Sequence, residues 1–240
     1  MQALLVVGPR SWHLAACALL VLSLVTGCAG RRESMQPVAW NPQAVRADTS
    51  RVGVAMRELP DREANYPGAR CLACRPLASA NNRALTLHAA TLDGREELQE
   101  LRADVVALLK KRGIDAVDVP EALTDEVAPA EGEITTLPAQ VEALRQRHRL
   151  GRLVVLEFES LGVQRPYAHY VPASLPYAVV EGRAYMLDLG TRRVLWMHRM
   201  RALPTADGEW DEPPDYPGLT NAYFQAIESV KDRVKQVLER

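Results

Sequence analysis

The sequence has no excess of charge of either sign. Among its 240 residues, 29 are lysine or arginine and 30 are aspartate or glutamate. A protein that binds the phosphate backbone of a nucleic acid needs a basic stripe. The two local basic clusters, at residues 110–112 and 145–152, lie at the ends of predicted helices, where cations complement the helix dipole. The composition therefore gives no electrostatic case for a nucleic-acid partner.

The sequence also lacks the short motifs of several common enzyme classes. It contains no G-x-S-x-G, H-E-x-x-H, G-x-x-x-x-G-K-[ST] or G-x-G-x-x-G pattern. Its histidines are dispersed and suggest no catalytic triad. Glu157 and Glu159 share one face of a predicted strand, but strand alternation explains this spacing better than an acid–base pair. We therefore predict no catalytic residues, no cofactor and no metal site.

The apolar run near the amino terminus is too short to span a membrane. Residues 13–25 form an apolar stretch of 13 residues, whereas a membrane-spanning helix needs about 20. Such a stretch behind a basic residue, here Arg10, is typical of an export signal peptide. We predict a signal peptide over residues 1–27. The alternative is an uncleaved amino-terminal anchor helix.

The signal ends in Val25-Thr26-Gly27-Cys28. This segment resembles the lipobox of bacterial lipoproteins, in which an apolar residue and two small ones precede a cysteine. The resemblance implies that the chain is cut before Cys28, and that its thiol takes a diacylglycerol and its amino group a fatty acid such as palmitate. Because Ala29 rather than an acidic residue follows, it also implies the outer membrane, with the protein on its periplasmic face.

Two further cysteines, Cys71 and Cys74, have the spacing C-x-x-C. An exported protein meets an oxidising compartment, where disulfides persist. Turn-forming residues at 66–68 and Pro76 flank the pair, so we expect it in a loop and not in the βαβ setting of a thioredoxin motif. We predict a structural disulfide. A redox-active pair and a metal site remain alternatives, although zinc would need two more ligands and only His88 is near in sequence.

The pattern of the mature chain predicts one α/β domain. Residues 28–50 comprise the acylated cysteine and a polar, unpatterned segment that we predict to be a flexible tether. Within residues 51–240, apolar spacing predicts the order β-α-β-α-β-β-β-α. The strands are expected at 51–56, 114–119, 153–158, 179–189 and 194–200, and the helices at 93–112, at 138–150 and from about residue 221. Strand–helix–strand crossovers and a final hairpin together predict a mixed sheet.

Two loops are rich in aromatic residues. Residues 165–177 carry three tyrosines and three prolines, and residues 203–218 carry five acidic residues with a tryptophan and a tyrosine. Such rings suit recognition because they bury area at small entropic cost. The predicted partner-binding residues are Tyr167, Tyr170, Tyr177, Trp210 and Tyr216. The acidic residues would select a basic partner. The alternative is that these rings pack the loops onto the sheet.

The predicted hairpin carries a second resemblance. Residues 178–189 lead into Gly190-Thr191-Arg192-Arg193-Val194-Leu195-Trp196. This resembles a hairpin of envelope lipoproteins that share an α/β fold with the curli-secretion lipoprotein and the amino-terminal domain of TolB, over about residues 51–202. It implies a non-catalytic component of envelope assembly, transport or wall synthesis, with an envelope protein or cell-wall partner. The alternative is a periplasmic enzyme or thiol-redox protein that uses Cys71 and Cys74.

Overall fold

The computed structural model describes residues 37–125, 127, 134, 136–212 and 215–240. The signal peptide, the lipobox and Cys28 lie outside the described residues. Among those that are described, no helix combines the length and the apolar character that a membrane crossing requires.

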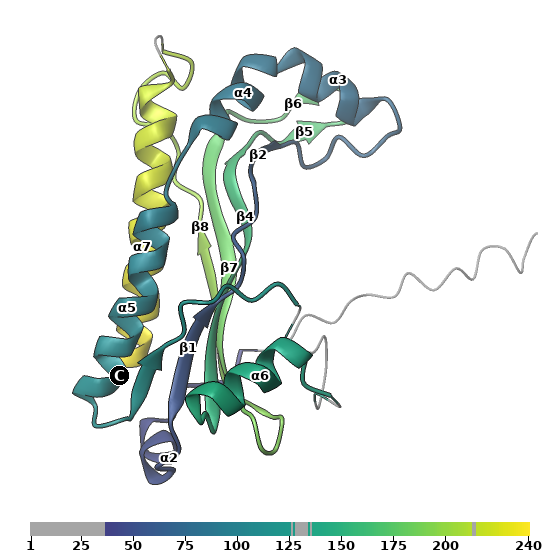
Figure 1. The fold of residues 1–240 in the computed structure, drawn as a ribbon. Helices are drawn as coiled ribbons and strands as arrows, with labels where there is room; N and C mark the ends of the chain where they lie inside the picture. Colours follow the sequence, from purple (N-terminus) through teal and green to yellow (C-terminus); the bar gives the residue numbers. More distant parts are fainter. Residues whose placement is uncertain (1–36, 126, 128–133, 135, 213–214) are drawn as a thin grey trace, which may run out of the picture. The chain divides into compact units, whose positions relative to one another are not determined.

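A mixed sheet forms the centre of the fold (Figure 1). Its strands are β1 (Val52–Met56), β2 (Arg62–Asn65), β3 (Ala116–Asp118), β4 (Arg152–Gln164), β7 (Tyr177–Asp188) and β8 (Val194–Ala202). The order is β3-β1-β4-β7-β8, and β2 pairs with the second half of β4. The pairs that β1 makes with β3 and β4 are parallel, whereas β4, β7 and β8 are antiparallel. The predicted mixed sheet is confirmed.

Helices cover the two faces of the sheet unequally. The long helices α5 (Arg95–Lys111) and α7 (Pro217–Glu239) pack on one face and form the larger apolar core together with the strands beneath them. The shorter α6 (Ala139–His148) and the segment before it cover the opposite face around the first half of β4. Residues 153–158 of β4 are all buried, as expected of a central strand covered on both faces.

The eight predicted elements are all present, and the described part of the chain contains six more. The additions are α2 (Pro42–Ala47), β2, α3 (Cys74–Asn81), α4 (Arg83–Thr91), β5 (Tyr167–Ala168) and β6 (Val171–Pro172). The expected loop between the first strand and α5 is thus a strand followed by two helices. The last helix begins at Pro217, earlier than its apolar stripe indicated, because Tyr216 takes a left-handed conformation (φ 52°) and sets the turn before it.

The predicted tether extends too far along the chain, because residues 37–50 pack on the domain. Val38 forms an antiparallel bridge with Met197 of β8, and the Trp40 ring packs edge-on against Trp196 with centroids 5.6 Å apart. Helix α2 begins after Asn41, whose side chain accepts a hydrogen bond from the Ala44 amide. A free tether therefore has to end before Val38.

Candidate binding surface

A small lobe stands at one end of the sheet, at the upper right of Figure 1. It consists of residues 66–92, with α3 and α4, and residues 165–177, with β5 and β6; we call it the disulfide lobe. Its own core is small. The members of that core are Ala69, Cys74, Ala78 and Tyr167, with Tyr66 and Cys71 beside them.

The disulfide between Cys71 and Cys74 is present, which confirms the predicted pairing. Its setting differs from the expected loop, since Cys74 is the first residue of α3 and is buried. Pro76 does not end the structure there, because proline is tolerated in the first turn of a helix. The bridge therefore fixes the turn that leads into α3.

Arg165 joins the two aromatic loops. Its guanidinium lies 4.9 Å from the centre of the Trp210 ring and donates a hydrogen bond to the Asn82 side-chain oxygen at 2.5 Å. The Asn82 amide in turn donates to the Tyr167 hydroxyl at 2.6 Å. Trp210 also stacks on Tyr216, with ring centroids 6.1 Å apart. The loops thus come together through a network in which Tyr167 is buried and the rings of Trp210 and Tyr216 are half-buried.

The remaining two predicted residues face different surroundings. The Tyr177 hydroxyl donates to the Gln164 side chain at 3.2 Å along the sheet. Tyr170 is 58% exposed and lies beside the disulfide, with its hydroxyl 3.6 Å from the Cys71 sulfur. Of the five predicted partner-binding residues, Tyr170 therefore has the most exposed ring.

His88 is buried where α4 meets the acidic loop. Its ring packs against Tyr216 with centroids 4.8 Å apart, and its Nε2 lies 3.2 Å from the Thr220 hydroxyl oxygen. Burial lowers the pKa of His88, and the nearby Asp215 carboxylate opposes this effect. Among the described residues no group of three or more histidine, cysteine or acidic side chains is placed to hold a metal ion.

A buried carboxylate that the sequence did not single out as a site lies at the middle of β4. Glu157 is only 2% exposed and accepts hydrogen bonds from Arg57 at 2.5 Å and from Arg183 at 3.1 Å. The Tyr185 hydroxyl lies 3.5 Å from it, and the pKa of Tyr185 is raised by burial and by the Glu157 charge. The positive charges of the two arginines balance the negative charge of Glu157, and the raised pKa of Tyr185 keeps the tyrosine protonated.

Glu159 does not form a close pair with Glu157. A bulge shifts the register between Phe158 and Ser160 and leaves Glu159 exposed, with its carboxylate 3.6 Å from Arg183. The two glutamates therefore face the same arginine, Arg183.

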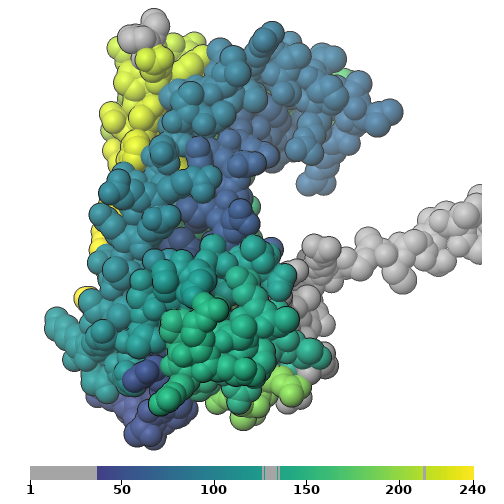
Figure 2. All heavy atoms as spheres, in the orientation of Figure 1, coloured from purple at the N-terminus to yellow at the C-terminus, as the bar shows by residue number. Residues whose placement is uncertain are grey.

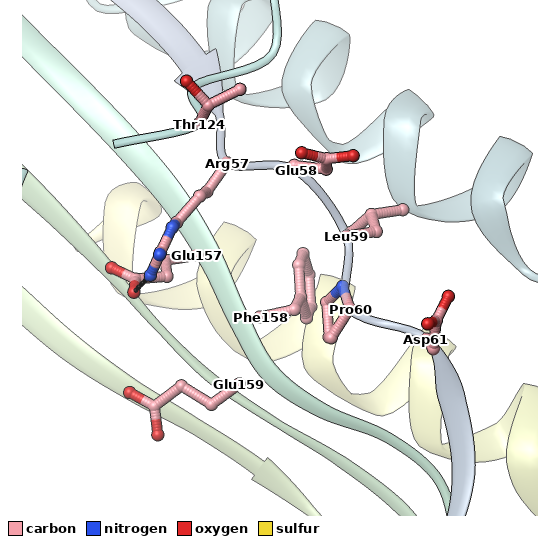
Figure 3. A pocket seen from close by; sticks show the side chains of 9 residues that line it. All are labelled: Arg57, Glu58, Leu59, Pro60, Asp61, Thr124, Glu157, Phe158 and Glu159. Carbon is pink, nitrogen blue, oxygen red and sulfur yellow. Dashed lines mark hydrogen bonds and ion pairs between the residues drawn. The ribbon is translucent and has the colours of Figure 1, made fainter. Parts of the chain in front are cut away.

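An acidic groove runs beside β2, next to this cluster. A hollow of about 550 Å³ is lined by residues 57–61, Thr124 and residues 157–159, and a smaller one of about 200 Å³ shares Pro60, Asp61 and Glu159 with it. Its carboxylates are Glu58, Asp61, Glu63, Glu157 and Glu159. Figure 3 shows Arg57 directed toward Glu157, whereas Glu58 and Asp61 point away from it. Figure 2 shows the surface hollowed between the disulfide lobe and the segment around α6.

Comparisons with known proteins give distant structural likeness. No family model matches the sequence, and no curated protein matches it. Protein XCC0632 of Xanthomonas campestris is 15% identical, with a TM-score of 0.37, over 86% of this chain and 93% of that one. A PelC dodecamer from Paraburkholderia phytofirmans is 11% identical, with a TM-score of 0.34, over 86% and 96%. Lipoprotein GNA1162 from Neisseria meningitidis is 12% identical, with a TM-score of 0.25, over 78% and 99%. Likeness at this level transfers neither a partner nor an activity.

Proposed function

We propose that this protein is a lipid-anchored, non-catalytic binding or assembly module of the bacterial cell envelope. Acylated Cys28 would hold it on the periplasmic face of the outer membrane. The resemblance of the hairpin at residues 178–196 to that of the curli-secretion lipoprotein and the amino-terminal domain of TolB supports such a role. The acidic groove beside β2 is the observation that carries it, because it combines a concave surface with exposed carboxylates and a strand edge.

The strand edge favours a polypeptide partner. One side of β2 pairs with β4, and among the described residues no strand pairs with its other side. An open strand edge presents backbone donors and acceptors to which an extended segment can add. The neighbouring segment already uses this geometry, since Leu123 forms a parallel bridge with Arg57 just before β2 begins.

The charge of the groove favours a basic partner. Glu58, Asp61, Glu63 and Glu159 are exposed, whereas Glu157 is neutralised by its arginines. Carboxylates around a binding site accelerate association with a partner of opposite charge. The expected partner is therefore an envelope protein that presents a basic, extended segment.

Site-specific crosslinking in intact cells tests this proposal. A photo-crosslinking amino acid at Glu63 should capture a protein, and Asp61→Lys in the same chain should reduce its yield. Glu239→Lys, an equal charge change at the end of α7, should leave the yield unchanged. The captured region should be basic. If nothing is captured at Glu63, or if both charge changes act alike, the groove is not the binding site.

A further inference from the structure

Exposed apolar side chains gather on the disulfide lobe. Eight large hydrophobic residues are exposed among the described residues, and six of them belong to this lobe. They are Leu72, Leu77, Leu87, Tyr170, Val171 and Leu175. Isolated exposed apolar residues are ordinary, but their concentration on one part of a surface marks an interaction site.

Leu72 is held in solvent by the disulfide. It lies within the four-residue turn that the Cys71–Cys74 bridge closes, and its side chain is 100% exposed. The Cys74 amide also donates to the Cys71 carbonyl oxygen at 3.1 Å, so the turn cannot fold Leu72 back into the lobe core. A rigidly presented leucine loses little conformational entropy when it is buried by a partner.

The charge of the lobe has a single sign. Residues 66–92 and 165–177 contain four arginines and two histidines but no aspartate or glutamate. Arg70 and Arg75 flank the disulfide turn and are exposed. The acidic loop meets the lobe on the other side, where Tyr216 contacts His88, and Figure 1 shows α3 on the side away from α7. The α3 side of the lobe thus combines two exposed arginines with exposed apolar and aromatic side chains, namely Leu72, Leu77 and Tyr170.

This combination of side chains is complementary to an anionic membrane surface. Aromatic and apolar side chains enter the boundary between head groups and acyl chains, while arginines pair with anionic head groups. An acidic protein partner would complement the arginines but would not account for the exposed apolar side chains. A lipid surface also accounts for apolar side chains that are spread over a turn, a helix and a hairpin without forming one enclosed pocket.

The position of the lobe agrees with a membrane contact. The antiparallel bridge between Val38 and Met197 places the first described residues of the chain beside β8. Met197 pairs with Tyr185, and the eight residues from there to Tyr177 span about 26 Å. The ten residues from Cys28 to Val38 can reach about 35 Å, which is enough for lipid and lobe to meet one bilayer.

We infer that the α3 side of the disulfide lobe, with Leu72 at its tip, docks on the anionic head groups of the membrane that carries the protein. The inference rests on the proposed lipid anchor, to which it adds a second contact. Docking would fix the orientation of the domain on the bilayer and leave the acidic groove, whose charge a membrane of this kind repels, accessible to a partner.

Tryptophan quenching by brominated lipids measures this contact. The acylated protein is reconstituted into vesicles that contain phosphatidylglycerol or only phosphatidylcholine, after mass spectrometry of the Cys28 peptide has tested the lipid anchor by itself. Relative to the parent, Leu72→Trp should add fluorescence that bromolipids quench in the anionic vesicles. Leu195→Trp, at the opposite end of the sheet, should add fluorescence that they do not quench. Arg70→Gln and Arg75→Gln should each weaken docking about fivefold.

The possible outcomes distinguish failure of the lobe–membrane contact from failure of the lipid anchor at Cys28. If Cys28 carries lipid but both new tryptophans are quenched alike, the lobe does not dock although the anchor stands. If Cys28 carries no lipid, the same two variants added to preformed vesicles still decide whether the lobe binds. Quenching of Leu72→Trp that is equal in both lipids and insensitive to the arginine changes would overturn recognition of anionic head groups. If an acidic protein, but no vesicle, shields the tryptophan of Leu72→Trp from solvent, recognition of anionic head groups is likewise overturned.

Discussion

The buried guanidinium of Arg152 donates a hydrogen bond to the carbonyl oxygen of Val45 at 2.7 Å. It also donates to the carbonyl oxygens of Asp48 at 2.7 Å and Ser50 at 2.8 Å. One side chain at the start of β4 thus satisfies three backbone acceptors of the segment around α2. Burial lowers the pKa of Arg152, an effect that the Asp48 carboxylate opposes. This contact turns part of the expected tether into part of the domain.

Removal of this contact should free the segment around α2. Arg152→Met should lower the free energy of unfolding by about 3 kcal/mol, because buried acceptors lose a charged donor. Arg152→Lys should recover little of this free energy, because an ammonium group cannot reproduce the planar set of donors of the guanidinium. Chemical denaturation gives the magnitude, and hydrogen exchange of residues 42–50 should accelerate.

Arg51→Met is the matched control for this prediction. Arg51 precedes β1 and pairs with Asp115 at 2.8 Å, with both side chains about half exposed, so its loss should cost at most about 1 kcal/mol. Equal effects of the two substitutions would show that Arg152 does not hold the segment.

The Glu157 cluster should behave as a structural unit. Glu157→Gln leaves Arg57 and Arg183 facing a neutral group in a buried position, and we expect it to lower the free energy of unfolding by about 3 kcal/mol. Glu159→Gln, which removes the exposed partner of the same arginine, should cost about 1 kcal/mol or less. Denaturant titration of the two variants provides the measurement. Similar losses would mean that the buried pairing contributes nothing beyond a surface ion pair.

The parts of the fold that the sequence predicts are those where apolar spacing is continuous. Residues 153–158 form an apolar run with Glu157 as its one charge, and they became the central strand. The segment Arg62-Glu63-Ala64-Asn65 has no such pattern. It forms β2 because β4 continues beyond the end of β1 and leaves an edge to which a backbone can pair. Pairing of this kind depends on tertiary context and not on local side chains.

The candidate surface was predictable in composition but not in geometry. The sequence marks the aromatic loops, but it cannot show that Arg165 links Trp210 to Asn82 and thereby turns some of these rings inward. The signal that could have pointed to the disulfide lobe was the absence of acidic residues at 66–92. The signal for the buried cluster was a single glutamate within an apolar strand.

Trp210 and Tyr170 should respond differently to replacement by alanine. Trp210 lies between Arg165 and Tyr216, so Trp210→Ala should lower the free energy of unfolding by about 2 kcal/mol. Tyr170 is exposed, so Tyr170→Ala should change it by about 0.5 kcal/mol or less. If Tyr170 contributes to binding, its replacement should weaken capture of the partner by at least about 1 kcal/mol. Capture that is unchanged in both variants would remove the aromatic loops from the binding surface.

Acylation of Cys28 remains a prediction from the lipobox. Cys28→Ala should abolish labelling by a clickable palmitate analogue, because it removes the thiol that receives the first lipid; two or more acyl chains anchor a protein stably. Cys17→Ala, within the predicted signal core, should label and fractionate like the parent. A Cys28→Ala variant that still takes up label would show that the lipid, if any, is attached elsewhere.

Stability should fall as the medium becomes mildly acidic, because the folded protein lowers the pKa of two histidines, the buried His88 and the half-buried His198. Burial lowers the pKa of His198, and the charges of Arg233 and Arg240 lower it further. In the unfolded chain it titrates near the ordinary value of about 6.5. The unfolded state therefore binds more protons than the folded state once the pH falls below about 6.5, and stability declines from there toward the folded pKa. His88, whose pKa is also lowered by burial, contributes in the same direction.

Between pH 7.5 and 5.5 the thermal midpoint of the parent should drop, and that of His198→Gln should drop less. His169→Gln, in the exposed β5–β6 hairpin, controls for the loss of a histidine as such. Parallel curves for the parent and His198→Gln would show that His198 does not couple folding to pH.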